Sequence, residues 1–295
     1  MVKYQHIYIK HIFGGSKKMP ILADCHMHSH HSGDSDASME SMIEAAIGAG
    51  LDTIAFTEHQ DFCYANSPDG AEDKVTPTSF MLNADSYLYE LLNMREKYRD
   101  KIRIEFGLEI GLQENCVKDN LIFARAHEYD YIIGSQHLVG GQDPYYESFY
   151  EGKDEKEVFR QYLTETLTNI KKFHNFDCLG HMDYIVRYFP SGNREYSYSE
   201  YGDIIDEILK HLIGNEKGIE INTKSISKGM KEFHPCMAVL KRYRELGGEI
   251  VTVGSDAHKP QYVGSEFARV PDVMLEAGFK YYCVYENRLP EYHKL

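Results

Sequence analysis

Two histidines separated by one residue, His26 and His28, follow a short apolar run near the start of the chain. If residues 21–25 form a strand, both imidazoles leave its end on the same face, because side chains two positions apart on a strand point the same way. Two imidazoles placed in this way can bind one metal ion. Asp34, six residues after His28, can turn back from the following loop as an oxygen ligand. An exposed histidine-rich loop is the alternative, so the interpretation depends on the other donors.

Further histidines and carboxylates stand at the ends of the other predicted strands. They are His59 after 53–57, Glu109 near the end of 102–110, His137 after 131–135, His181 after 177–180, and Asp256 with His258 after 249–253. Six of the 15 histidines thus stand at strand ends, which favours a metal site over a histidine-rich loop. Imidazole and carboxylate ligands suit zinc, manganese or iron, and nine donors are too many for one ion. We therefore predict three divalent transition-metal ions, with a carboxylate bridging two of them.

The elements that would position these donors alternate along the chain from residue 21 onward. Apolar residues recur at helical spacing from Met39 to Ile47, and Gly50 is a typical C-terminal stop. Asp154 and Glu157 form a start similar to a capping box for a helix that continues to about residue 173. Further helices are predicted at 79–100, 116–128, 200–213, from Pro235 to before Gly247, and at 274–277, with further strands at 218–222 and 281–285.

Seven strand–helix units in a row predict a parallel sheet. An open doubly wound sheet and a closed barrel both fit this order. Polar residues concentrate at the carboxyl ends of the strands, where α/β barrels carry their active sites, so we favour a distorted (βα)7 barrel with the metal site at its C-terminal mouth. Residues 20–295 are expected to form this single domain. Residues 1–19 are expected to be a leader outside the core, with an extra edge strand at 7–12 as the alternative.

Composition restricts the classes of partner. The chain has 295 residues and a net charge of −14, so binding to a phosphate backbone, which requires a basic surface, is not expected. None of the six cysteines lies in a CxxC pair, and no apolar run approaches the roughly 18–20 residues that span a bilayer. We therefore expect a cytoplasmic protein that binds neither nucleic acid nor membrane and acts on a small molecule. The oligomeric state is not predicted.

Six segments in order resemble the successive motifs of the PHP (polymerase and histidinol phosphatase) family: DCHMHSHHSGDSD, AFTEHQDF, FGLEIGL, IIGSQHLVGG, CLGHMDYI and VTVGSDAHKP. The resemblance runs from residue 21 to the end of the chain. Within the family, the insert at 79–100 and the segments SQHLVGG and HMDYIVRY resemble the histidinol-phosphate phosphatase type. The resemblance implies a distorted seven-stranded barrel with a trinuclear site. It also implies hydrolysis of L-histidinol phosphate to L-histidinol and phosphate in histidine biosynthesis.

The resemblance also implies a distribution of the ligands. It assigns His26, His28, Glu109 and Asp256 to the first metal, Glu109 as a bridge with His137 and His181 to the second, and Asp34, His59 and His258 to the third. Some relatives carry a histidine at the position of Asp34, and His30 or His31 could take its place if the loop is arranged differently.

The expected reaction needs three kinds of group. Metal ions bridged by Glu109 would lower the pKa of water and supply a nucleophile near neutral pH. His59 and metal-bound water are the candidates to assist the departing alkoxide, and Arg187 is expected to bind phosphate oxygens, unless it is a surface ion pair. Lys224, Lys228 and Arg269 are weaker candidates for contact with the substrate, and a solvated side chain is the favoured alternative for each. Acidic or aromatic residues, such as Asp61, Phe62, Tyr145 or Tyr146, would bind the amine and the imidazole.

Three other functions fit parts of the sequence. A PHP-type enzyme could act on another small phosphate ester, a nucleotide, phosphotyrosine or a DNA end. An amidohydrolase barrel also carries HxH after its first strand, but such barrels often use a lysine in the fourth strand, which is missing here. A metal store or sensor built on an inactive barrel predicts missing ligands, whereas all nine are present.

Overall fold

The computed structural model describes residues 20–295 and contains seven parallel strands in the order in which they occur in the chain. The strands are β1 (Ala23–Met27), β2 (Thr53–Gln60), β3 (Arg103–Gly111), β4 (Tyr131–Ser135), β5 (Cys178–Leu179), β6 (Gly218–Asn222) and β7 (Val251–Gly254). Beyond the strand ends, the N–H of His28 donates to the carbonyl of Ala257 at 2.9 Å, and that of Asp256 to the carbonyl of His26 at 2.8 Å. The first and last strands therefore meet, and the predicted distorted barrel is confirmed over the open sheet.

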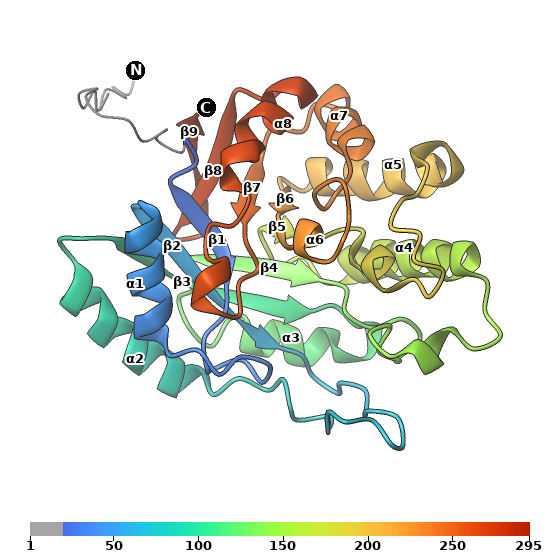
Figure 1. Cartoon of the computed structure of the whole chain (residues 1–295), viewed down its shortest axis with the longest axis horizontal. Coiled ribbons are helices and arrows are strands. Elements are labelled where there is room, and N and C mark those ends of the chain that lie inside the picture. The colour runs from blue at the N-terminus through green and yellow to red at the C-terminus, as the bar shows by residue number, and fades with distance from the viewer. Residues whose placement is uncertain (1–19) are drawn as a thin grey trace.

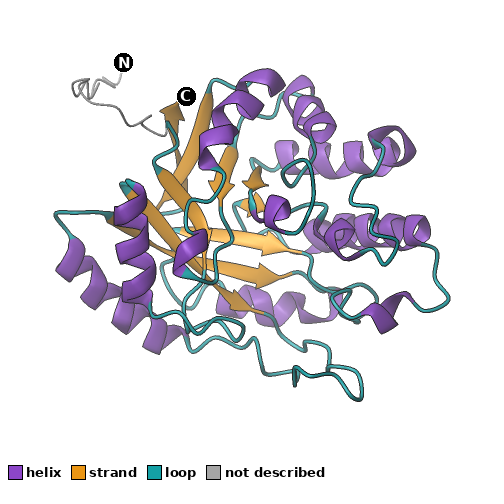
Figure 2. Ribbon diagram, viewed as in Figure 1, coloured by secondary structure: helices purple, strands orange, loops and turns teal. Residues whose placement is uncertain are grey.

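Helices surround the outside of this barrel (Figures 1 and 2). They are α1 (Met39–Ala49), α2 (Ala84–Tyr98), α3 (Val117–Phe123), α4 (Glu155–Lys172), α5 (Tyr198–Gly214), α7 (Met237–Glu245) and α8 (Val270–Ala277). The short helix α6 (Lys224–Ser227) lies instead just past the carboxyl end of β6. Two of the residues that the sequence places at helix ends are found there. Gly50 ends α1 with a left-handed φ of 80°, and the carboxylate of Asp154 accepts from two N–H groups at the start of α4. Because both faces of the strands are covered, β1 and β3–β7 read as almost continuously buried runs.

Several predicted helix ends differ from the observed ones. The helix expected at 79–100 begins only at Ala84, because the side chain of Asn83 accepts from the N–H of Ser86 and caps it there. The helix expected at 116–128 ends at Phe123, and α8 begins at Val270, four residues earlier than expected. The short helix α6 was not predicted, since four residues are too few to show a helical period.

The C-terminal end of the chain forms a hairpin in place of the single strand expected at 281–285. Strand β8 (Tyr281–Glu286) pairs antiparallel with β9 (Leu289–Lys294). Asn287 and Arg288 join them with φ values of 51° and 64°. Positive φ at both central residues is the geometry of a two-residue type I′ turn, which usually carries Asn-Gly. Here Arg288 stands in place of the glycine, so the sequence did not indicate a hairpin.

The expected leader, residues 1–19, and its alternative strand at 7–12 lie outside the described residues. Within residues 20–295, no helix combines the length and the apolar character needed to cross a membrane. All six cysteines fall in this described part, where they are free thiols, and only Cys63 is exposed.

Candidate metal centre

The nine predicted donors converge at the carboxyl ends of the barrel strands. His26, His59 and Glu109 lie within β1, β2 and β3, and the other donors lie in the loops that follow the strands. His26, His28 and Glu109 are fully buried, whereas the Asp34 side chain is 42% exposed at the rim. Six strand ends thus contribute to one site, as the parallel topology requires.

Glu109 stands at the centre of the cluster, and its Oε2 faces three imidazoles. This oxygen is 3.1 Å from Nε2 of His26, 3.4 Å from Nε2 of His28 and 3.1 Å from Nδ1 of His59. Although burial favours the neutral acid, the surrounding imidazoles, led by those of His26 and His59, hold the pKa of Glu109 well below its usual range. The carboxylate is therefore ionised and available as a ligand.

The other oxygen of Glu109 faces a separate pair of histidines. Its Oε1 lies 3.2 Å from Nε2 of His137 and 2.8 Å from Nε2 of His181. One carboxylate thus has different imidazoles on its two oxygens, which is the arrangement needed to bridge two ions.

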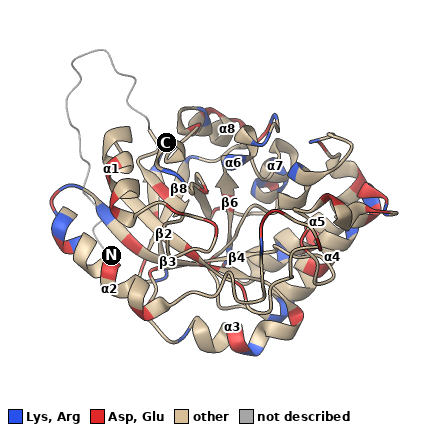
Figure 3. Cartoon of the chain, turned by 60° about the horizontal axis from the view of Figure 1, so that its bottom comes forward, with Lys and Arg blue, Asp and Glu red and all other residues tan. Residues whose placement is uncertain are grey.

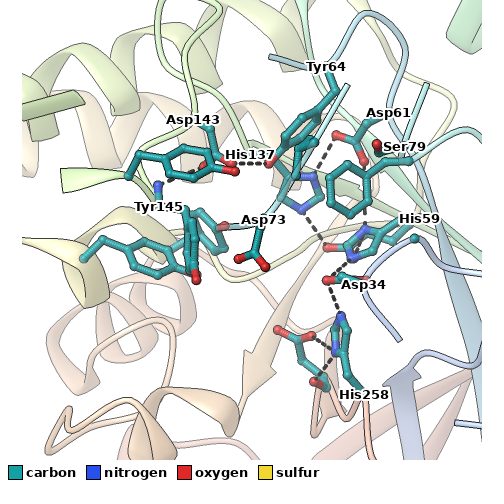
Figure 4. Close-up of a pocket in the computed structure, with 18 of the residues that line it drawn as sticks. Asp34, His59, Asp61, Tyr64, Asp73, Ser79, His137, Asp143, Tyr145 and His258 are labelled. Carbon is teal, nitrogen blue, oxygen red and sulfur yellow. Dashed lines mark hydrogen bonds and ion pairs between the residues drawn. The ribbon is translucent and has the colours of Figure 1, made fainter. Parts of the chain in front are cut away.

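Three residues at the rim form an outer group beside His28. Oδ2 of Asp34 lies 2.9 Å from Nε2 of His258 and 3.7 Å from Nε2 of His59. The ring of His28 lies beside both the ring of His59 and the ring of His258, with centroid separations of 4.2 Å in each case, and those two rings are 5.7 Å apart. Figure 4 shows Asp34 between His59 and His258 at the edge of the pocket. The donors at 34, 59 and 258 are therefore placed together.

Asp256 connects the inner donors to a lysine. Its Oδ1 lies 2.8 Å from Nζ of Lys224, 3.7 Å from Nε2 of His28 and 3.9 Å from Nε2 of His26. Lys224 and His26 lower the pKa of this buried aspartate well below its usual range, against the effect of burial. Its φ of 51° is a left-handed conformation that is uncommon for aspartate, and such residues concentrate at functional sites.

Buried carboxylates and a hydroxyl fix the orientation of three imidazoles. Nδ1 of His26 donates to Glu220 at 2.5 Å, Nδ1 of His137 to Asp61 at 2.8 Å, and Nδ1 of His28 to the hydroxyl of Ser32 at 3.0 Å. With Nδ1 protonated, the lone pair of Nε2 points into the cluster, which is the usual arrangement around metal-binding histidines. Gly254 makes room for one of these contacts, since a Cβ there would lie 2.5 Å from Glu220.

Sequence reasoning missed these supporting residues or assigned them wrongly. Asp61, one of four candidates for contact with the substrate's amine or imidazole, is 1% exposed and is hydrogen-bonded to His137 (Figure 4). Glu58 accepts from the hydroxyls of Ser29 and Ser32, and was not predicted. The available signal was a glutamate inside an otherwise apolar strand, at 58 in β2 and at 220 in β6, because a buried charge requires a partner.

The donor set fits divalent transition metals because several of its buried polar atoms lack hydrogen bonds. Within the described residues, Nδ1 of His59, Nε2 of His258 and Oε2 of Glu109 are buried at ion-pair distance from other donors but form no hydrogen bond with them or with any other group. Nε2 of His26 and Nε2 of His28 also face each other at 3.1 Å. Polar atoms left in this way cost free energy, and metal ions bound by mixed imidazole and carboxylate ligands would satisfy them.

Beside the donors lies a cavity of about 500 Å³, and three of the four cationic residues predicted to contact the substrate line it. Arg187, Lys224 and Lys228 line it, and the Arg187 side chain is only 5% exposed, with its guanidinium over the Tyr184 ring. The alternative of a surface ion pair for Arg187 is therefore wrong. Arg269 is also a wrong prediction, because it does not line the cavity and pairs at the surface with Glu266 at 3.0 Å.

Three other residues that the sequence offered as candidates lie outside the cavity. Phe62 packs against Phe123 and does not line the cavity, whereas Tyr145 and Tyr146 do. His30 and His31 do not occupy the position of Asp34, because they turn toward Glu90 on α2.

Comparisons with known proteins agree with this geometry. The family model of the PHP domain matches residues 24–224. A "probable histidinol-phosphatase" of Clostridium acetobutylicum is 36% identical over 91% of this chain and 98% of its own length. A histidinol-phosphatase of Lactococcus lactis is 31% identical over 87% of this chain and 91% of its own.

A solved structure extends the likeness to three dimensions. The histidinol phosphate phosphatase of Lactococcus lactis, crystallised with zinc, L-histidinol and phosphate, superposes with a TM-score of 0.82 at 30% identity. The match covers 91% of this chain and 98% of that one. On the sequence, the barrel and these comparisons, the chain belongs to the PHP domain family.

Proposed function

We propose that this chain is a metal-dependent phosphatase that hydrolyses L-histidinol phosphate to L-histidinol and phosphate, in the biosynthesis of histidine. The observation that carries the proposal is that seven of the nine donors line one cavity together with Arg187, Lys224 and Lys228, while His26 and His28 contact Glu109 in its wall. Relatives named for this activity cover most of the chain, and one of them binds zinc, L-histidinol and phosphate in its crystal structure.

We propose three divalent ions, with zinc, manganese or iron as the candidate metals. The ligands would be His26, His28, Glu109 and Asp256 for the first, Glu109 with His137 and His181 for the second, and Asp34, His59 and His258 for the third. Bound there, the ions would lower the pKa of water and stabilise charge on the phosphoryl group. Glu109 would hold the first two sites at a fixed separation.

The phosphate would bind between Arg187 and the two lysines. Nε and Nη1 of Arg187 are buried and have no hydrogen-bond partner within the described residues. Burial, with the nearby Arg187 and Lys224, lowers the pKa of Lys228. Positive groups that repel one another in this way would be stabilised by a phosphate dianion, and the guanidinium can donate to two of its oxygens.

His59 is the chain's candidate for contact with the departing oxygen. Although burial opposes the charged form, the carboxylates of Glu109 and Asp34 raise the pKa of His59. Its two ring nitrogens face these two carboxylates at 3.1 and 3.7 Å. As a ligand, the imidazole cannot also donate a proton from the same nitrogen, so its role as an acid requires the other nitrogen to face the substrate.

The histidinol part of the substrate would occupy the aromatic side of the cavity. Asp143 lies there, 7% exposed, and accepts from the hydroxyl of Tyr64 at 3.0 Å (Figure 4). Tyr145, Tyr146 and Tyr188 line the same side. A carboxylate among aromatic rings suits a ligand that carries an ammonium group and an imidazole.

We further propose that nucleic acid and membranes are not partners and that the protein works in the cytoplasm. The chain carries a net charge of −14, and acidic and basic residues are mixed over the helices seen in Figure 3. Free thiols are typical of a reducing compartment.

A panel of phosphate esters tests the proposed substrate. We expect kcat/KM for L-histidinol phosphate to exceed that for phosphotyrosine peptides and nucleoside monophosphates by orders of magnitude, because only the former places a cation near Asp143. A higher kcat/KM for one of the other esters would still support a metal-dependent phosphatase, but it would contradict L-histidinol phosphate as the substrate. An Asp143→Asn variant should have a smaller ratio of kcat/KM for L-histidinol phosphate to kcat/KM for the other esters, with its metal content unchanged.

A further inference from the structure

A second group of metal-type donors lies outside the cavity, where the loop after β1 meets α2. Nε2 of His31 is 2.9 Å from Oε2 of Glu90, and Nε2 of His30 is 3.4 Å from the same oxygen. The three donor atoms all lie within 4.8 Å of one another. None of these residues lines the cavity beside the cluster of nine donors, which we call the main centre.

We propose that His30, His31 and Glu90 form a separate binding site for a divalent transition-metal ion such as zinc. Two imidazoles and a carboxylate are a common protein ligand set for zinc, with water in the fourth position. Zinc bonds of about 2.0–2.2 Å place two ligands of a tetrahedral ion roughly 3.3–3.6 Å apart. The separation of 3.4 Å between His30 and Glu90 falls in this range, and that between His31 and Glu90 requires only a small opening.

An ordinary histidine–carboxylate ion pair explains less of this geometry. Such a pair joins His127 and Asp85 at 3.5 Å, and within the described residues neither of them belongs to a group of three possible metal ligands. At Glu90, by contrast, two neighbouring rings with centroids 4.5 Å apart direct a nitrogen at one oxygen. This convergence distinguishes a ligand set from a single pair.

The backbone and the neighbouring side chains hold the three donors in place. The N–H of His30 donates to the carbonyl of Ala37 at 2.7 Å, which closes the loop. The ring of His31 packs against Tyr87, one turn before Glu90 on α2, and the Tyr87 hydroxyl is hydrogen-bonded to the carbonyl of Phe56 at 2.9 Å. Donors that are already ordered lose little conformational entropy when they bind an ion.

The exposure of the site indicates an exchangeable ion. The side chains of His30 and Glu90 are 44% and 29% exposed, so water can reach the open coordination positions. An ion there would join the loop that carries His28 and Asp34 to α2. Binding to the folded state alone would raise the midpoint of thermal unfolding as free zinc increases.

The test is a count of zinc ions per chain after equilibrium dialysis against buffered zinc, followed by elemental analysis. We expect Glu90→Gln and His31→Phe each to bind one ion fewer than the wild type while keeping its turnover. His127→Phe, the matched control at the ordinary pair, should bind as many ions as the wild type. Because the readout is a difference in ion number, it is independent of how many ions the main centre holds and of its substrate.

Two results would overturn the proposal. One is an equal ion count for the wild type and Glu90→Gln. The other is a loss of two or more ions together with turnover, which would mean that the substitutions act on the main centre. The zinc-dependent rise of the unfolding midpoint provides a second readout, and it should be smaller in both variants than in the wild type and in His127→Phe.

Discussion

The inner and the outer donors of the main centre are held in different ways. His26 and His137 are buried, and their second ring nitrogens are fixed by Glu220 and Asp61. Asp34 projects from a loop at the rim, and its side chain is 42% exposed. The difference indicates that two ions would be bound tightly on rigid strands, while the ion at the rim would exchange more readily.

The largest effect is expected at the residue that joins the two inner sites. Glu109→Gln keeps the shape of the side chain but removes the charge that faces five imidazoles, so we expect at least two ions to be lost and turnover to fall about 10³-fold or more. Elemental analysis and phosphate release measure both. Glu105→Gln, the same change near the start of β3, is the control and should keep its metal.

A substitution that spares every donor should separate binding of phosphate from binding of metal. Arg187→Ala is expected to reduce kcat/KM about 10²–10³-fold with the metal content unchanged, because the buried guanidinium is the strongest available partner of the phosphate. Steady-state kinetics with L-histidinol phosphate measures this change. Arg269→Ala should behave as wild type, and equal losses in the two variants would count against the placement of the phosphate.

The rim is tested by Asp34→Asn. We expect one ion to be lost and two to be retained, with activity reduced about 10–100-fold, because the oxygen that faces His258 loses its charge. Metal analysis after dialysis against a weak chelator measures the ions that remain. Asp36→Asn changes an exposed neighbour and is the control. Loss of all ions in Asp34→Asn would contradict the division into inner and outer sites.

The smallest effect is expected at a supporting residue. Asp61→Asn leaves all ligands present but weakens the orientation of His137, so we expect about 10-fold weaker metal binding and near-normal turnover when metal is saturating. Titration of the metal-free protein with zinc or manganese, followed by activity, measures the shift. If turnover stayed low at saturating metal, Asp61 would have a role beyond positioning His137.

The sequence predicted which candidate donors converge better than it predicted the residues that support them. Each donor stands at a strand end, and parallel strands bring those ends together, so a one-dimensional pattern was sufficient to group His26, Glu109 and Asp256. Glu220 and Asp61 support histidines from distant parts of the chain, and no local pattern indicates which imidazole a buried carboxylate will meet.

The fold was likewise predicted in its main pattern but not in all of its details. The alternation of strands and helices predicted the barrel, while the hairpin of β8 and β9 was missed because its turn lacks the usual glycine. Arg269 was predicted as a substrate contact from its charge alone. Its distance from the cavity depends on the path of the chain between β7 and α8, which residue type does not encode.

The most direct test of the account is to measure metal content and phosphate release from L-histidinol phosphate on one sample of the purified protein. We predict about three transition-metal ions at the main centre, with any further ion removed by Glu90→Gln, and rapid release of phosphate that a chelator abolishes and added metal restores. A protein that binds no metal and stays inactive after addition of zinc, manganese or iron would contradict the account.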